Sequence, residues 1–253
     1  MLLNRSTVKK TSYARPPITE AVIGVNVATP LESKALDKAN GRFLKHYPQH
    51  QSVQNVSFKV ALNAEGQANA DGTEVEKGYK RFNADVNELL VLWHSAFIVS
   101  QLAPYPGWDI FFARFVRDWK IWKRAVGFQS ISRIGVRFIN RIDIPIFDNT
   151  VKHETYLNIY PKLPDTLENI GPYAVQAVVP LNDIQCNLTL NSASVPSPIL
   201  EHGSFLLDLD IAKDTGLPQK DNDIFDLLNK IREKKNEVFE SCVSDNAREL
   251  FRT

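Results

Sequence analysis

Residues 131–146 alternate between apolar and other side chains, and no other pattern in this sequence constrains the fold as strongly. Successive side chains of a β-strand point to opposite faces of its sheet. Six apolar residues would then share one face: Ile134, Val136, Phe138, Ile142, Ile144 and Ile146. The other face would carry Arg133, Gly135, Arg137, Ile139 and Arg141. The alternation predicts a strand that is buried on one face and carries a row of three arginines on the other.

A second strand supplies acidic partners for this row. In residues 205–211 the apolar side chains fall on one face, and Asp208 and Asp210 fall on the other. Cross-strand pairing of these aspartates with Arg133, Arg137 and Arg141 costs less than burying either charge alone. Two alternatives stay open. In the first, the arginines form an anion-binding track, in which neighbouring arginines lie four residues and therefore roughly 13 Å apart at about 3.3 Å per residue. In the second, Asp208 and Asp210 hold a metal ion with further oxygen ligands.

The rest of the chain predicts two similar halves. Hydrophobic periodicity and turn residues indicate strands and helices in the order β-α-β-β-β-α, twice. The strands are expected at 21–27, 53–62, 75–84, 88–102, 131–146, 172–180, 183–191 and 200–212, and the helices at 31–47, from 108, near Tyr156 and up to 242. Residues 63–73 indicate a turn rich in Gly, Asn and Asp.

The predicted fold class is therefore α+β with duplicated β-α-β-β-β-α halves, built as antiparallel sheet or sheets with the long helices packed on one face. The expected organisation is a flexible N-terminal arm over 1–15, a first half over 16–128 and a second half over 129–253. We expect the two halves to form one compact unit.

Composition excludes several classes of function. The net charge is +1, so no global field attracts nucleic acid or an anionic membrane. No apolar run reaches the roughly 20 residues needed to span a bilayer, and no signal peptide is evident. Cys186 and Cys242 have no metal-binding spacing, and we expect them to be reduced thiols in a cytoplasmic protein.

The sequence predicts no catalytic residues, no cofactor and no resident metal. It lacks the nucleophile-elbow, phosphate-loop and dinucleotide-binding motifs. His46, His50, His153 and His202 show no metal-ligand spacing. His94 lies in an apolar segment, where a histidine is more often a hydrogen-bonded core residue than a catalyst.

Three other segments are candidates either for a binding surface or for packing on the body of the protein. The loop before residue 108 contains Pro104 and Tyr105 and, with Trp108, is a candidate binding loop or a rigid connector. The following helix has aromatic residues at helical spacing, which indicates a core-facing stripe more often than a base-stacking platform. The end, 244–251, predicts a serine-capped helix that docks Leu250 and Phe251 on the body.

Four stretches together resemble a sporadically distributed bacterial family of uncharacterised function. They are Pro16-Pro-Ile-Thr-Glu-Ala-Val22, Ser100-Gln-Leu-Ala-Pro-Tyr-Pro-Gly-Trp108, Arg133 to Ile142 with Leu206 to Ile211, and Val238-Phe-Glu240 with Ser244 to Glu249. The resemblance spans most of the chain and implies no catalytic residue. The patchy distribution of the family implies an accessory role, such as phage defence or a toxin and antitoxin pair.

We therefore expect a non-enzymatic interaction or sensor module of a bacterial accessory system that binds a protein partner. The alternative is a nucleic-acid-binding protein or nuclease that uses Arg133, Arg137 and Arg141 on phosphates. No membrane association is expected, and the sequence leaves the oligomeric state open.

Overall fold

The computed structural model describes residues 13–62, 68–146, 151–164, 166 and 171–252, with the backbone alone between residues 55 and 74. The first half of the chain contains, in order, β1 (Ile18–Val27), α1 (Ser33–Arg42), β2 (Gln49–Leu62), β3 (Ala68–Phe82), β4 (Glu88–Trp93), β5 (Ala96–Leu102) and α2 (Trp108–Val126). The second half contains β6 (Ile131–Pro145), α3 (His153–Tyr156), β7 (Ala174–Leu181), β8 (Cys186–Val195), β9 (His202–Lys213), α4 (Asp221–Cys242) and α5 (Asp245–Arg252).

The strands found in the described residues join in the order β2-β3-β4-β5-β1-β6-β9-β8-β7, and the α+β class is confirmed. The second half has the predicted β-α-β-β-β-α order followed by α5, but the first half has one strand more than predicted. Residues 88–102 form a hairpin of β4 and β5 rather than one strand. Its turn at His94 and Ser95 is held by long-range bonds: His94 Nδ1 lies 2.5 Å from Leu31 O, and Ser95 N–H donates to Glu76 Oε1 at 2.8 Å.

The chain divides into two compact units. Unit 1 comprises residues 1–21, 103–105 and 135–253, and unit 2 comprises residues 22–102 and 106–134. The boundaries between the units fall inside β1 and β6, so each of these strands contributes residues to both units.

The core of unit 2 is aromatic. The buried face of α2 presents Phe111, Phe115, Trp119 and Trp122, as the helical spacing predicts. Phe97 of β5 lies among them, with its ring centre 5.4 Å from that of Trp122 and 6.1 Å from that of Phe115. Trp119 and Trp122 are 2% and 1% exposed, so these rings are core residues and are not a base-stacking surface.

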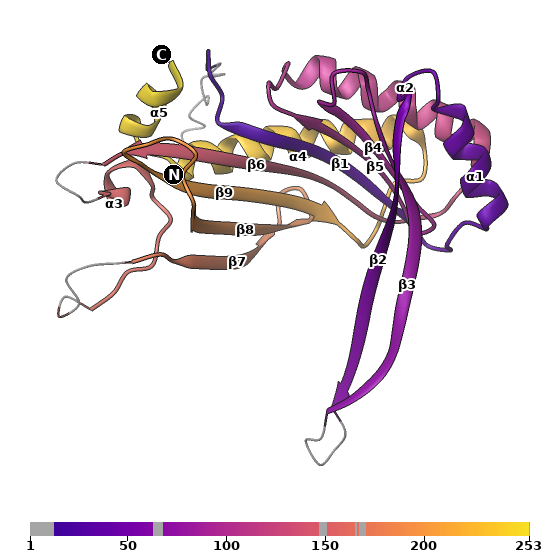
Figure 1. Ribbon diagram of the computed structural model, residues 1–253, viewed down its shortest axis with the longest axis horizontal. Coiled ribbons are helices and arrows are strands. Elements are labelled where there is room, and N and C mark those ends of the chain that lie inside the picture. Colours follow the sequence, from indigo (N-terminus) through magenta and orange to yellow (C-terminus); the bar gives the residue numbers. More distant parts are fainter. Residues whose placement is uncertain (1–12, 63–67, 147–150, 165, 167–170, 253) are drawn as a thin grey trace, which may run out of the picture. The chain divides into compact units, whose positions relative to one another are not determined.

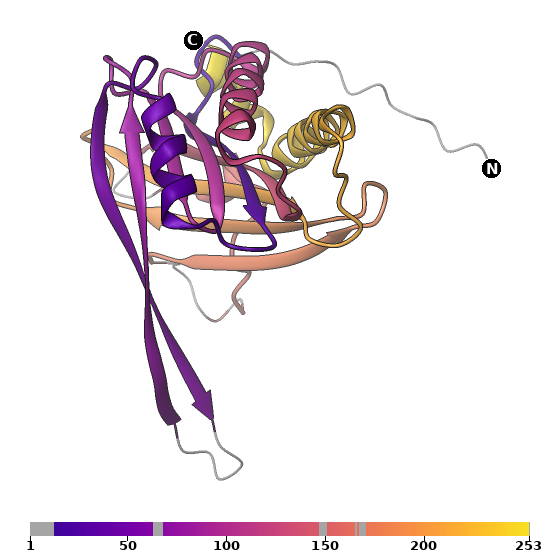
Figure 2. The ribbon, with the colours of Figure 1, turned by 90° about the vertical axis from the view of Figure 1, so that its right-hand side faces the viewer.

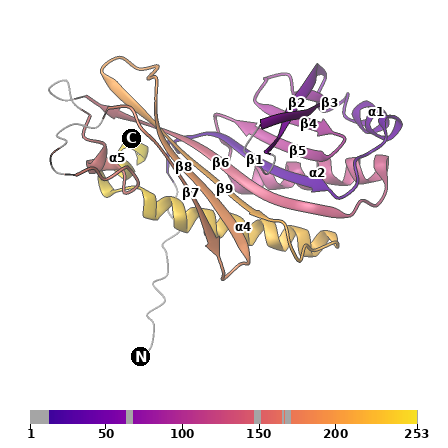
Figure 3. The same cartoon turned by 90° about the horizontal axis from the view of Figure 1, so that it is seen from below.

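In unit 1, α4 packs on the apolar face of the strands (Figure 3). The predicted alternation of β6 is confirmed. Its even-numbered apolar residues from Ile134 to Ile144 are 0–1% exposed, whereas Arg137 on the opposite face is exposed. Ile146 departs from the prediction and is 37% exposed, because β6 ends at Pro145. Each buried aliphatic side chain of this face contributes roughly 1.5–3 kcal/mol of hydrophobic stabilisation.

The hairpin of β2 and β3 extends beyond the sheet of unit 2 (Figures 1 and 2). β3 pairs with β4 only over Gly78 to Phe82, but it pairs with β2 from Ala68 to Phe82. We call the part outside the sheet, residues 54–62 and 68–77, the β-ribbon. The turn predicted for 63–73 is wrong for residues 68–73, which belong to β3, while residues 63–67 lie outside the described part of the chain.

The first described residues contact the C-terminal helices α4 and α5 in unit 1. Residues 1–12 of the predicted flexible arm lie outside the described residues, but Tyr13 and Arg15 are bound. Tyr13 O–H donates to Glu240 Oε1 at 2.8 Å, and Arg15 N–H donates to Phe251 O at 2.9 Å. Burial raises the pKa of Tyr13 to about 12, and the Glu240 carboxylate adds to this effect. Phe251 is 3% exposed, so α5 docks on the body of the protein as predicted.

Candidate functional site

A row of hydrogen-bonded polar side chains crosses four strands on the face of unit 1 opposite α4. Arg137 Nε and Nη2 donate to the two carboxylate oxygens of Asp208 at 2.8 and 2.7 Å. Asn191 Nδ2 donates to Asp208 Oδ2 at 3.1 Å, and Gln176 Nε2 donates to Asn191 Oδ1 at 2.7 Å. These four side chains, which we call the polar row, come from β6, β9, β8 and β7 in that order.

The strand register places these groups opposite one another. Asn191 pairs with Asp208 between β8 and β9, and Gln176 pairs with Asn191 between β7 and β8. Asp208 is nearly buried, with 9% of its side chain exposed, whereas 47% of the Arg137 side chain is exposed. The hydrogen bonds to Asp208 raise the pKa of Arg137 above its usual value, although partial burial acts in the opposite direction. The Arg137–Asp208 pair is the cross-strand pair that the sequence suggests.

The other arginines of the predicted row behave differently. Arg141 binds Asp143 of its own strand, with Nε 3.1 Å from Oδ1. Ser204 Oγ of β9 donates to the same oxygen at 2.5 Å. Arg133 belongs to the part of β6 in unit 2. The negative charge of Asp210 also acts to raise the pKa of Arg137. Among the described strand residues of unit 1, this face therefore carries Arg137 and Arg141 beside Asp143, Asp208 and Asp210, and these charges have no positive excess.

The metal hypothesis for Asp208 and Asp210 gains no support from this geometry. Both oxygens of Asp208 already accept hydrogen bonds from Arg137 or Asn191. Within the described residues, no group of three or more histidine, cysteine, aspartate or glutamate side chains is arranged to hold a metal ion. The polar row offers hydrogen-bond donors and acceptors, and none of its four side chains is a nucleophile paired with a base.

The candidate binding loop is a connector in which two of the three named residues are packed. A cis peptide bond joins Ala103 to Pro104, and Pro104 is exposed. The Tyr105 ring meets Phe138 edge to face at 5.7 Å between centres, in unit 1. Trp108 is 7% exposed and stacks on Phe112 at 5.3 Å in unit 2. Of the three, Pro104 is exposed, Tyr105 is half-buried and Trp108 is buried.

Unit 2 contains a buried polar cluster that sequence reasoning missed. Tyr47 O–H donates to Asp118 Oδ2 at 2.5 Å, and Arg117 Nε donates to Asp118 Oδ1 at 2.8 Å. Arg114 Nη1 donates to Tyr47 Oη at 3.0 Å, and Arg114 Nη2 donates to the backbone oxygen of Ser100 at 2.8 Å. Asp118 and Tyr47 are 0% exposed. Burial and the Asp118 charge raise the pKa of Tyr47, which keeps its hydroxyl protonated.

The buried groups of this cluster satisfy one another's hydrogen bonds, while 39% of the Arg117 side chain is exposed at its edge. A signal for it was present in the sequence. Arg114 and Asp118 lie four residues apart on α2, and both interrupt the buried stripe of aromatic residues. Tyr47 lies far away in sequence, after α1, so the local pattern could not identify the partner.

Three other side chains singled out in the sequence, Cys186, Cys242 and His153, are buried. Cys186 and Cys242 are free and buried, and burial raises the pKa of each thiol. His153 is 8% exposed and lies against the rings of Tyr160, Tyr173 and Phe205. Across the described ranges of the chain, we find no helix that has both the length and the apolar character needed to cross a membrane.

Comparison with known proteins supports no assignment of this chain to a family or to a known fold. No protein-family model and no curated protein sequence matches this chain. Among solved structures, the chain is similar to the di-domain ARO/CYC StfQ from the steffimycin biosynthetic pathway, with 10% sequence identity and a TM-score of 0.18. That alignment covers 91% of this chain and 97% of the StfQ chain. So low a TM-score carries no argument about function.

Proposed function

We propose that this protein is a non-enzymatic binding module that engages a protein partner through its β-ribbon. The proposal rests on the pairing of β3. This strand stays paired with β2 over residues 68–77, ten residues beyond its last pair with β4. At about 3.4 Å per residue, the β-ribbon extends roughly 30 Å past the sheet. Figures 1 and 2 both show it leaving the sheet of unit 2.

A two-stranded ribbon of this kind is suited to binding. An isolated hairpin is at best marginally stable in water, because it buries little apolar surface. Among the described residues, neither strand of the β-ribbon pairs with a third strand. Both edges therefore offer backbone N–H and C=O groups, and a partner strand can add to either edge. Such pairing would stabilise the β-ribbon and would use protein backbone as the ligand.

Charge favours a protein over a nucleic acid. Residues 54–77 contain two lysines, Lys59 and Lys77, and four acidic residues, Glu65, Asp71, Glu74 and Glu76. A net charge of −2 repels phosphates, whereas arms that bind nucleic acid are basic. The sheet face of unit 1 that carries the polar row also gives no reason to expect nucleic acid, since Asp208 pairs with Arg137 and Asp143 pairs with Arg141. The arginine-track alternative thus has less support than the protein-binding proposal.

The resemblance to a sporadically distributed bacterial family implies that the binding module belongs to an accessory system. Accessory proteins commonly act with a partner encoded beside them, and we expect the gene of the partner to be adjacent. The role in phage defence or in a toxin and antitoxin pair rests on that resemblance alone.

Capture of partners by two forms of the protein tests the proposal. In the shortened form, Asn-Gly replaces residues 56–75, so that Asn55 and Glu76, which face each other in the register, flank a tight turn. We expect a protein from the native host to bind the full chain and to be lost with the shortened form, while both forms melt at similar temperatures.

Recovery of the same proteins by both forms would contradict the proposal. Nuclease-sensitive retention of nucleic acid that is lost in an Arg137→Gln variant would support the alternative. Arg137→Gln also serves as the control for the first experiment, because it leaves the β-ribbon unchanged and should retain the protein partner.

A further inference from the structure

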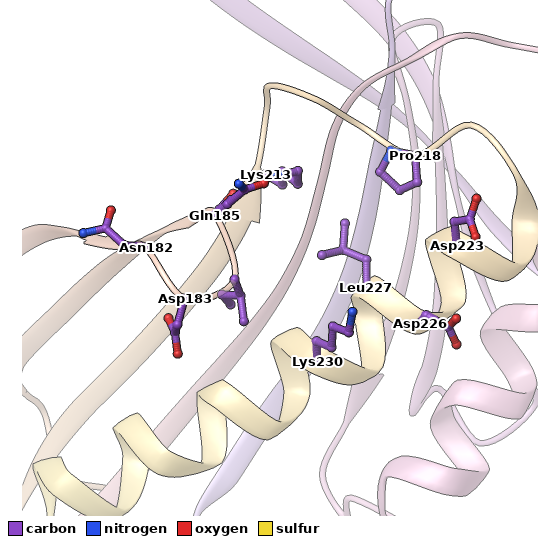
Figure 4. A pocket seen from close by; sticks show the side chains of 10 residues that line it. Asn182, Asp183, Gln185, Lys213, Pro218, Asp223, Asp226, Leu227 and Lys230 are labelled. Carbon is purple, nitrogen blue, oxygen red and sulfur yellow. Dashed lines mark hydrogen bonds between the residues drawn. The ribbon is translucent and has the colours of Figure 1, made fainter. Parts of the chain in front are cut away.

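Unit 1 contains a cavity of about 490 Å³ between the turn that joins β7 to β8 and the first half of α4 (Figure 4). The turn contributes Asn182 to Gln185, and α4 contributes residues from Asp223 to Lys230. The end of β9 contributes Lys213, and the segment between β9 and α4 contributes Pro218. The volume lies within the range of small-molecule sites, roughly 300–1,000 Å³.

Lys213 is the unusual residue of this cavity. It is the last residue of β9 and is 8% exposed. Its ammonium group donates to two oxygens of Gln185, the backbone oxygen at 3.0 Å and Oε1 at 3.3 Å. In the described part of the chain, no carboxylate forms an ion pair with it within 4.0 Å. An ammonium group that is buried with neutral acceptors alone has lost hydration without gaining an opposite charge.

The nearest acidic residue of the turn is already paired elsewhere. Asp183 Oδ2 lies 2.5 Å from Nζ of Lys234, and this bond lowers the pKa of Asp183 below its usual value. Figure 4 shows the Asp183 carboxylate directed away from Lys213. Lys230, from α4, supplies a second cation to the lining.

Other lining groups limit the size of a ligand. Asp223 and Asp226 lie on the α4 side of the cavity and are exposed. Their negative charges oppose a large polyanion, whose charge would extend past the cavity to reach them. A compact anion can contact Lys213 or Lys230 without extending to these aspartates, and Gln185 adds a neutral amide to the lining.

We propose that this cavity binds a small molecule through a carboxylate or phosphate group, with Lys213 as the buried anchor and Lys230 as the second cation. Anion binding supplies the opposite charge that Lys213 lacks. The site is independent of the β-ribbon, which belongs to unit 2, and it would make the protein responsive to a metabolite as well as to a partner.

Thermal melting with simple anions tests the site. The probes are inorganic phosphate and citrate, compared with chloride at equal ionic strength so that general screening is constant. Phosphate or citrate should raise the melting temperature of the native protein, because a ligand that binds only the folded state stabilises it. The Lys213→Met variant should not respond, and without added anion it should melt at the same temperature as the native protein or higher.

Lys220→Met is the matched control. Lys220 is an exposed cation of the same unit, just before α4, and it does not line the cavity. This variant should keep the response to anions. An unchanged response in Lys213→Met, or a response lost equally in both variants, would overturn the proposal.

Calorimetric titration of the native protein provides a second measurement that needs no variant. Binding of phosphate or citrate with a dissociation constant below about 10 mM is expected. Absence of heat and of a melting shift with both anions would show that the cavity is not an anion site. Either failure leaves the β-ribbon proposal untouched, because partner capture is measured separately.

Discussion

The Nζ atom of Lys235 lies 3.9 Å from the centre of the Phe138 ring, between α4 and β6 of unit 1. The ring face attracts the cation, but Lys235 is only 7% exposed. Loss of hydration, with a smaller contribution from Arg232, lowers the pKa of Lys235 from 10.5 to about 7, and Glu240 opposes this change.

This pKa makes stability depend on pH. The unfolded chain keeps the Lys235 proton up to about pH 10.5 and the folded chain releases it near pH 7, so unfolding takes up a proton between these values. The contribution of Lys235 to the free energy of unfolding therefore rises with pH across this window. Lys235→Met should be more stable than the native protein at about pH 6, and the gain should shrink by about pH 9.

Urea unfolding at several pH values measures the effect. Lys38→Met, at an exposed position of α1, serves as the control and should leave the pH dependence of the native protein unchanged. If Lys235→Met retains that dependence too, the pKa of Lys235 is not the cause.

Removal of either partner from the Arg137–Asp208 pair should destabilise unit 1. Arg137→Met leaves a nearly buried carboxylate with Asn191 as its remaining side-chain donor, at a cost of about 1–2 kcal/mol after allowance for the exposure of Arg137. Asp208→Asn should cost a similar amount, and the double variant should cost less than the sum of the two single changes. A double-mutant cycle in urea measures this coupling, and strict additivity would mean that the pair contributes nothing.

Tyr47 and Tyr79 offer a matched comparison of one hydrogen bond in two environments. Each hydroxyl donates to an aspartate, Tyr47 to buried Asp118 at 2.5 Å and Tyr79 to Asp37 at 2.6 Å near the surface. Tyr47→Phe should lower the free energy of unfolding by about 1–3 kcal/mol, because Asp118 then lacks one donor in the interior. Tyr79→Phe should cost less than about 1 kcal/mol. If chemical denaturation shows equal losses of unfolding free energy for the two variants, burial of the cluster does not increase the contribution of this hydrogen bond.

Gly78 and Gly41 should respond in opposite directions to alanine. A Cβ atom at Gly78 would lie 2.4 Å from Cε3 of Trp93, its partner across the strands, and 2.7 Å from the backbone oxygen of Leu92. Gly78→Ala should therefore lower the melting temperature by several degrees. Gly41, in the last turn of α1, has no atom within 4 Å of such a Cβ, and Gly41→Ala should stabilise by up to about 1 kcal/mol. Melting curves of both variants measure these opposite changes in melting temperature.

Local patterns in the sequence were sufficient for the strongest elements. The alternation over 131–146 identified β6 and its buried face, and the aromatic spacing identified α2. Both patterns are determined by the burial of the segment itself, so they can be recognised without knowledge of its partners.

Features that depend on distant partners were missed. The β4–β5 turn contains neither glycine nor proline, and its contacts come from Leu31 and Glu76. β3 begins within a segment whose composition indicates a turn, because its backbone pairs with β2. The location of Asp118 in the interior likewise requires Tyr47, which is 71 residues away in sequence.

The assignment of three separate stretches to unit 1 constrains how the chain can be divided. A shortened protein that starts at residue 129 would lack residues 18–21 and 103–105, which belong to unit 1. One cleavage anywhere in the backbone therefore leaves at least one unit incomplete. An autonomous version of unit 1 would need its stretches rejoined by new linkers, for example through circular permutation.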